Sequence, residues 1–315
     1  MPARFAGSKR IVSVIAFLLA LVPAAALGQA SYYRHTFFDN GPHEASYYYS
    51  SGKAVAPSKL ETLGKRLPLD GTTYFTGPNS VKVAWESAPG GAWAADIGVL
   101  VFRNRDYHFD GDTLSFWVYA PEALPAAAMP RFRLLDMARQ FSKPAPLGEF
   151  SGDIPAKKWT RVSIPFRRIE TGSIHALDPR QLKTLIFQQG QADGAPHTLF
   201  VDEIRIDPAR ADGAKPAPLP APENLKAKAY ERHIDLSWDY PTGDGSSGSR
   251  AERFVIYRSL DGKNFVPVGV QTPGIHRYTD FLGKVGETAD YRVAASDRAT
   301  ASRRRPPWLR RRRTR

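Results

Sequence analysis

Short runs in which apolar and polar residues alternate recur along this chain, and they constrain its fold more than any other feature. The run from 229 to 239 places Ile234, Leu236 and Trp238 at every second position, which is typical of a strand with one buried face. Asp261-Gly262 separates two further runs, and this dipeptide favours a tight hairpin. Between 31 and 207 convincing helical periodicity is lacking. The sequence therefore predicts an all-β protein.

The segment 31–207 is expected to form one β-sandwich of about eight to ten strands. Its most apolar run, 113–119, carries large side chains on both faces, with Trp117 and Tyr119 opposite Phe116. One of these faces must be covered by a second sheet. The other face is left to serve as a platform.

The composition limits the chemistry that the chain can support. Its 315 residues leave room for about two domains, and it contains no cysteine. Disulfides, thiol catalysis and cysteine-ligated metals are therefore excluded. Stability has to come from the burial of apolar side chains.

The net charge of +13 is concentrated at the two ends of the chain. Three basic residues without an acid stand in 1–30, and eight arginines stand in 303–315, which leaves +2 for the body. A nearly neutral body gives no indication of nucleic-acid binding. We therefore expect no nucleic-acid partner.

The N-terminus is typical of a secretory signal peptide, which we place at 1–29. Basic residues precede the apolar run 11–22, and Ala26-Leu27-Gly28 offers small residues for cleavage. The run is short for a bilayer span. The sequence thus predicts a secreted or periplasmic protein with no membrane span after cleavage, and an uncleaved anchor is the alternative.

The segment 208–222 is a Pro/Ala linker, which favours extended and semi-rigid chain. The segment 223–298 follows it and reads as a second sandwich. It resembles a fibronectin type III domain in residues spread over its whole length, with Tyr291 at the position of that family's corner tyrosine. The residues that carry this resemblance are Pro222, Leu225, Leu236, Trp238, Tyr257, Tyr278, Asp280, Tyr291, Val293 and Ala295.

The tail 299–315 does not continue the pattern of the second sandwich. It holds eight arginines and two prolines and shows no alternation, so we expect it to be disordered and the sandwich to lack a clear last strand. Our hypothesis is that the reading frame is cut or shifted near Ala301. An authentic basic tail that binds an acidic polymer is the alternative.

The segment 31–207 resembles the jelly-roll, galactose-binding-like modules of secreted carbohydrate-active enzymes. The resemblance rests on Phe38-Asp39 and on the runs 111–118, 158–165 and 200–206. Together with the fibronectin-like segment, it is similar to the N-terminal, non-catalytic region of secreted bacterial glucoamylase-like glycoside hydrolases, including those of the exo-β-1,2-glucooligosaccharide sophorohydrolase type. The resemblance implies a catalytic helical barrel after the fibronectin-like domain. We expect the chain to be truncated before that barrel.

Carbohydrate binding requires flat aromatic faces and planar polar side chains. Trp117 and Tyr119 are the aromatic candidates. Arg131 and Arg133 would share one face of a strand that ends near Asp136, and Gln188 ends another strand. These six residues form our predicted glycan site, with a β-glucan as the expected ligand. Trp117 as a core residue under a loop is the alternative, and Trp85 and Trp159 are assigned to the core.

A structural Ca²⁺ ion is a further expectation. The resemblance implies carboxylate ligands near the ends of the first sandwich, where Asp39 and Asp202 stand, and hard oxygen ligands suit Ca²⁺. In the alternative, Asp39 caps a turn and Asp202 pairs with an arginine.

No catalytic residue is predicted. Glycoside hydrolysis needs two carboxylates across a cleft, and no acid spacing fixes such a pair; the seven histidines are scattered singly. The favoured function is an accessory, carbohydrate-binding or spacer part of a secreted glucan-processing enzyme. A stand-alone secreted glycan-binding or adhesion protein and a jelly-roll glycan-cleaving enzyme are the alternatives.

Overall fold

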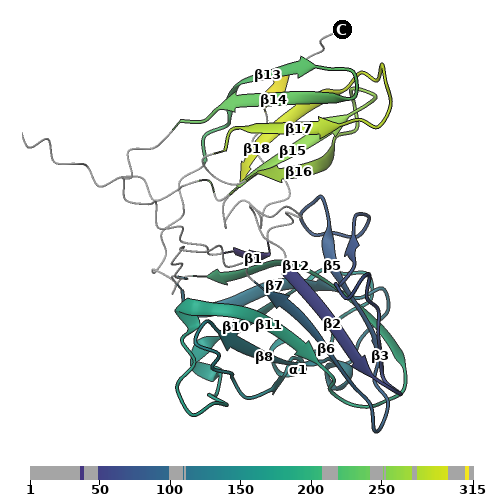
Figure 1. Ribbon diagram of the computed structural model, residues 1–315, viewed down its shortest axis with the longest axis vertical. Helices are drawn as coiled ribbons and strands as arrows, with labels where there is room; N and C mark the ends of the chain where they lie inside the picture. The colour runs from purple at the N-terminus through teal and green to yellow at the C-terminus, as the bar shows by residue number, and fades with distance from the viewer. Residues whose placement is uncertain are drawn as a thin grey trace, which may run out of the picture. The chain divides into compact units, whose positions relative to one another are not determined.

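The computed structural model describes residues 36–38, 49–98, 109, 111–207, 219–241, 251, 253–271, 275–296 and 309–311. Within these residues the chain forms nineteen strands, one single-turn α-helix and three short 3₁₀ helices (Figure 1). The predicted all-β sandwich fold is confirmed. None of the helices in this part of the chain has the length and apolarity to cross a membrane. The signal-peptide segment and Asp39 lie outside the described residues.

Twelve of the described strands form a first sandwich of two antiparallel sheets. The seven-stranded sheet contains β1 (Thr36–Phe38), β3 (Lys59–Leu60), β4 (Leu69–Asp70), β5 (Ser80–Glu86), β7 (Thr113–Tyr119), β10 (Thr160–Pro165) and β12 (Pro196–Asp207). The five-stranded sheet contains β2 (Tyr49–Val55), β6 (Ala92–Gly98), β8 (Arg131–Asp136), β9 (Ala145–Pro146) and β11 (Leu182–Gln188). Their orders are β10-β7-β12-β5-β3, with β1 on β12 and β4 on β5, and β2-β6-β11-β8-β9. Helix α1 (Gly148–Ser151) follows β9.

Alternating side chains of both sheets meet in the core of the first sandwich. On β7, Leu114, Phe116 and Val118 are fully buried, and the ring of Phe116 meets that of Phe187 on β11 edge-on at 5.9 Å. Trp85 is buried in the same core, as predicted. Trp159 is only half-buried and lies outside this core, so its assignment to the core was wrong.

Seven further strands form a second sandwich. They are β13 (Glu223–Ala229), β14 (His233–Asp239), β15 (Arg253–Ser259), β16 (Val266–Gln271), β17 (Arg277–Phe281), β18 (Asp290–Ser296) and β19 (Leu309–Arg311). Among the described residues, β13-β14-β17 make a sheet of three strands and β16-β15-β18-β19 a sheet of four. Leu236 and Trp238 enter the core as their alternation predicts, and the Trp238 ring meets Phe254 edge-on at 5.5 Å.

Strand β19 differs from the expectation that the basic tail supplies no strand. Leu309, Arg310 and Arg311 pair with Val293, Arg292 and Tyr291 of β18. The expectation rested on side-chain alternation, whereas an edge strand pairs through backbone N–H and C=O groups, which every non-proline residue carries. Three residues without an apolar pattern can therefore extend the sheet.

Candidate functional site

The outer face of the five-stranded sheet, turned away from the core, presents an ordered set of polar side chains. Along β6, Trp93, Ala95 and Ile97 point into the core, so the residues between them point outward. The same alternation puts Phe132 and Leu134 of β8 inside. Because these strands pair directly, the outward residues line up in rows across the sheet.

The first row crosses four strands and joins Ser51, Asp96, Ile186 and Arg133. The Ser51 hydroxyl donates to Asp96 Oδ2 at 3.3 Å. The guanidinium of Arg133 lies 4.5 Å from the centre of the Phe141 ring, and its buried Nε–H has no hydrogen-bond partner among the described residues. A buried donor without a partner is costly.

Asp96 is the described carboxylate with a raised pKa. Burial raises the pKa of Asp96 above its ordinary value, while the Ser51 hydroxyl and the positive charges of Lys53 and Arg133 act in the opposite direction. Both charges that act on it are cations. Asp96 is thus a partly buried carboxyl group near two basic side chains.

In the second row, each residue is two positions from the first-row residue of the same strand. This row joins Lys53, Ala94, Gln188 and Arg131. The small side chain of Ala94 lies in the middle of the row, and Lys53 and Arg131 are exposed at its ends. Strands β2 and β8 are three spacings apart, which is about 14 Å. The two rows together present ammonium, guanidinium, amide and carboxylate groups across four strands.

Trp117 and Tyr119 lie on the other sheet. They point outward from β7, where the Phe75 ring stacks on Trp117 at 4.1 Å and 15°. Tyr119 contacts the rings of Trp159 and Phe200 at 5.4 and 5.9 Å. Phe75 thus covers one flat face of Trp117, as in the alternative in which a loop buries it. The structure does not bring these two aromatics together with Arg131, Arg133 and Gln188.

Asp136 ends β8, as predicted, but it is buried and serves a local structure. Its carboxylate accepts hydrogen bonds from the backbone N–H groups of Gln140 at 2.8 Å and Asp178 at 3.0 Å. It thereby ties together two turns beside the outer face. Its predicted role in glycan binding stays a prediction.

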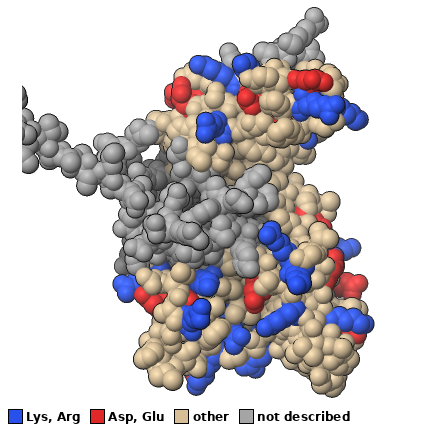
Figure 2. All heavy atoms as spheres, in the orientation of Figure 1, with Lys and Arg blue, Asp and Glu red and all other residues tan. Residues whose placement is uncertain are grey.

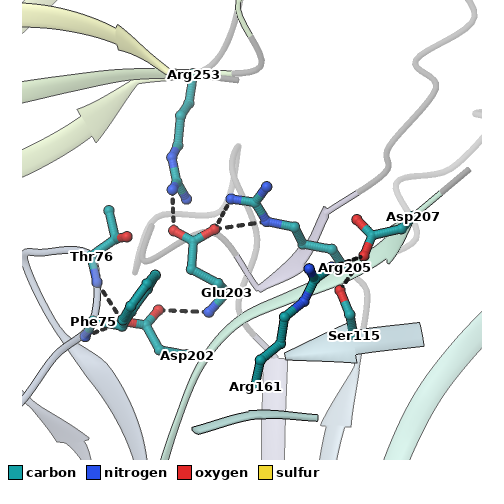
Figure 3. Close-up of polar contacts among 9 residues, drawn as sticks. All are labelled: Phe75, Thr76, Ser115, Arg161, Asp202, Glu203, Arg205, Asp207 and Arg253. Atoms are coloured by element: carbon teal, nitrogen blue, oxygen red, sulfur yellow. Dashed lines mark hydrogen bonds and ion pairs between the residues drawn. The ribbon is translucent and has the colours of Figure 1, made fainter. Parts of the chain in front are cut away.

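Asp202 holds a loop in place (Figure 3). Its Oδ2 accepts the N–H groups of Phe75 at 2.8 Å and Thr76 at 2.9 Å, and its Oδ1 accepts that of Glu203 at 2.7 Å. No group of three His, Asp or Glu side chains that could hold a metal occurs in the described ranges. Asp202 alone does not fit a calcium site, and calcium at Asp39 and Asp202 stays a prediction.

Sequence reasoning named Arg131, Arg133 and Gln188 as candidates but did not name Ser51, Lys53 and Asp96, which the structure places on the same face. The available signal was the polar position between Ala95 and Ile97 in an otherwise apolar run. On the surface seen in Figure 2, basic and acidic side chains are interspersed over the described residues. This distribution agrees with a nearly neutral body.

Comparisons with known proteins relate the chain to a glucan-degrading enzyme. No protein-family model matches it. Over 286 residues, 90% of its length, it is 34% identical to the exo β-1,2-glucooligosaccharide sophorohydrolase (non-reducing end) of Parabacteroides distasonis, of which it covers 39%. The crystal structure of a β-1,2-glucanase from the same organism matches with a TM-score of 0.70 and 34% identity, over 85% of this chain and 37% of that one.

A family 30 carbohydrate-binding module matches with a TM-score of 0.42 and 18% identity, over 55% of this chain and 98% of the module. That likeness is too distant to carry an argument. The chain is thus homologous to a β-1,2-glucan-degrading enzyme over nine-tenths of its own length, and it spans about two-fifths of the length of the relatives that it matches.

Proposed function

We propose that this chain is a non-catalytic accessory region, carbohydrate-binding and spacer-like, of a secreted or periplasmic glucan-processing glycoside hydrolase. The observation that carries the proposal is the homology over nine-tenths of the chain to an enzyme of which it covers only 39%. The signal-peptide pattern at 1–29 supports export. The proposed ligand is a β-1,2-linked glucan, which is the substrate class named for the relative.

The engagement of the carboxylates supports a non-catalytic role. A glycosidase needs a carboxyl group with a raised pKa and a second carboxylate within about 5 to 10 Å. Asp96 has the raised pKa, but the charges that act on it are those of Lys53 and Arg133. Asp136 and Asp202 are committed to backbone N–H groups.

The outer face of the five-stranded sheet is the proposed glycan-binding surface. Lys53, Arg131 and Gln188 offer donors to sugar hydroxyls, and Asp96 offers an acceptor. We place Trp117 and Tyr119 second because Phe75 already occupies one face of Trp117.

Titration calorimetry of the full chain with β-1,2-gluco-oligosaccharides of increasing length tests the proposal, with β-1,4-gluco-oligosaccharides as the comparison. We expect saturable binding of the β-1,2-linked series. Arg131→Ala and Gln188→Ala should each weaken it about 2- to 10-fold, because a hydrogen bond contributes about 0.5–1.5 kcal/mol. Arg167→Ala, an exposed arginine elsewhere in the first sandwich, should have no effect and is the matched control.

The other outcomes separate the parts of the proposal. Absence of saturable binding would refute glycan binding and leave the spacer role. Loss of binding in Trp117→Ala, with Arg131→Ala unchanged, would move the site to the seven-stranded sheet. Release of shorter sugars during incubation would refute the non-catalytic role. A melting temperature that is the same in excess Ca²⁺ and in chelator would remove the calcium prediction.

A further inference from the structure

Glu203 occupies an irregular position on β12. The register of β12 against β7 shifts between Asp202 and Arg205, and Glu203 has a φ of 53°, in the left-handed region that non-glycine residues rarely adopt. A β-bulge of this kind re-aims a side chain. The side chain of Glu203 is nevertheless only 1% exposed, so a strained backbone delivers a carboxylate into a buried place.

Two arginines hold this carboxylate, one from each sandwich (Figure 3). Oε2 accepts from the Nε–H of Arg205 at 2.8 Å and from its Nη2, and Oε1 accepts from Nη2 of Arg253. Arg205 belongs to β12, whereas Arg253 is the first residue of β15 in the second sandwich. Both guanidinium groups are buried with the carboxylate. The contact between the sandwiches is therefore ionic and shielded from water.

The electrostatics of this group favour the assembled state. Burial by itself raises the pKa of Glu203, but the charges of Arg205 and Arg253 outweigh it and hold the pKa well below its ordinary value. Asp202 precedes Glu203 in the sequence, and the charges of these two carboxylates balance those of Arg205 and Arg253. Separation of the sandwiches would remove one of the two positive charges, and removal of one partner from a buried pair is strongly destabilising.

A second contact lies at the loop that Asp202 holds. Gly77 follows the two residues anchored by Asp202, and a Cβ built on Gly77 would collide with the Pro267 ring of β16. Tyr74, in the same loop, acts electrostatically on Tyr257 of β15. The loop from 74 to 77 therefore packs against the second sandwich at a position where only glycine fits.

We propose that Glu203, Arg253 and the loop from 74 to 77 lock the two sandwiches into one rigid body. The lock presents whatever is joined to the second sandwich at a fixed angle to the first. This inference does not depend on glycan binding, and it goes beyond the semi-rigid spacing that the Pro/Ala linker predicts.

Spin labelling of the full chain tests the lock. Because the chain has no cysteine, Lys158→Cys and Lys284→Cys, two exposed positions on different sandwiches, give a specific pair of labels for distance measurement by pulsed electron resonance. We expect a single narrow distance distribution. A broad distribution in the otherwise unchanged chain would overturn the proposal.

Two variants attack the lock by different routes. Arg253→Met keeps an unbranched side chain and removes its charge, and Gly77→Val adds a bulky side chain without removing a charge. Each should replace the narrow peak by a broad distribution. The matched controls are Arg232→Ala, an exposed arginine of the second sandwich, and Gly71→Ala, where an added Cβ would have ordinary contacts.

The far-ultraviolet circular dichroism spectrum of each variant checks that both sandwiches remain folded. If Arg253→Met loses the β spectrum, Gly77→Val alone decides the question. A narrow peak that persists in Arg253→Met, in Gly77→Val and in a folded variant that combines the two changes would refute the lock.

Discussion

Tyr291→Phe removes a hydroxyl that joins β18 to β17 inside the second sandwich. The Tyr291 hydroxyl donates to Asp280 Oδ2 at 2.6 Å, and the guanidinium of Arg258 donates to both oxygens of the same carboxylate at 3.0 and 3.2 Å. Tyr291 and Asp280 are 4% and 5% exposed. The hydrogen bond thus has an ionised acceptor in a place that water does not reach.

The expected cost follows from the charge of the acceptor. A hydrogen bond to a charged group contributes about 1.5–3 kcal/mol, whereas one between neutral groups contributes about 0.5–1.5 kcal/mol. Tyr278 provides the neutral comparison because its hydroxyl donates to the carbonyl oxygen of Val268 at 3.0 Å. We therefore expect Tyr291→Phe to lower the free energy of unfolding by about twice as much as Tyr278→Phe.

Urea unfolding, followed by fluorescence and circular dichroism, measures the free energy of unfolding of both variants. The slope of this free energy against urea concentration should be the same in both variants and in the unchanged chain. Tyr230→Phe, at a residue that is 44% exposed, is the control and should change the free energy of unfolding by less than about 0.5 kcal/mol. If Tyr291→Phe costs no more than Tyr278→Phe, the charged acceptor does not strengthen the bond and the reasoning fails.

Three further outcomes are expected. Burial and the neighbouring Asp280 raise the pKa of Tyr291 above 10.0. Because the unfolded chain loses this proton at a lower pH than the folded chain, the free energy of unfolding should fall as the pH rises above about 10. A pH series of melting temperatures should show a smaller fall in Tyr291→Phe. Asp202→Ala leaves three backbone N–H groups without their acceptor and should cost at least about 2 kcal/mol in urea unfolding, so a smaller loss would argue against its role as an anchor. Lys59→Ala breaks an exposed pair with Glu86 and should cost less than about 1 kcal/mol; a larger loss would contradict the expected screening by water.

Local patterns predicted several strands of both sandwiches, but not β2 and β6 of the first sandwich. Alternation at Ile234, Leu236 and Trp238 identified the buried face of β14, since side-chain direction in a strand has a period of two. Asp261-Gly262 likewise marked the turn between β15 and β16. Such signals depend on residues close in sequence, so a single sequence carries them. The same reasoning missed β19 because backbone pairing at a sheet edge leaves no mark in the side chains.

The candidate site could be predicted only in part. Arg131 and Arg133 were expected to share a strand face near Gln188, and the register of β8 and β11 confirms this arrangement. Trp117 and Tyr119 were grouped with them, but β7 belongs to the other sheet. Sequence shows which residues share a face of one strand, but not which strands become neighbours.

The sequence by itself determined the all-β class, the buried faces of a few strands such as β14 and the near-neutral charge of the body, because these follow from composition and local periodicity. Tertiary structure alone decided that Asp96 stands in a row with Arg133 and that Glu203 meets Arg253. Those pairs are 37 and 50 residues apart, and their contacts depend on strand register, on a bulge in β12 and on the packing of one sandwich against the other. Strands of similar sequence could pair in many ways, and the free energy of the whole fold determines which pairing forms.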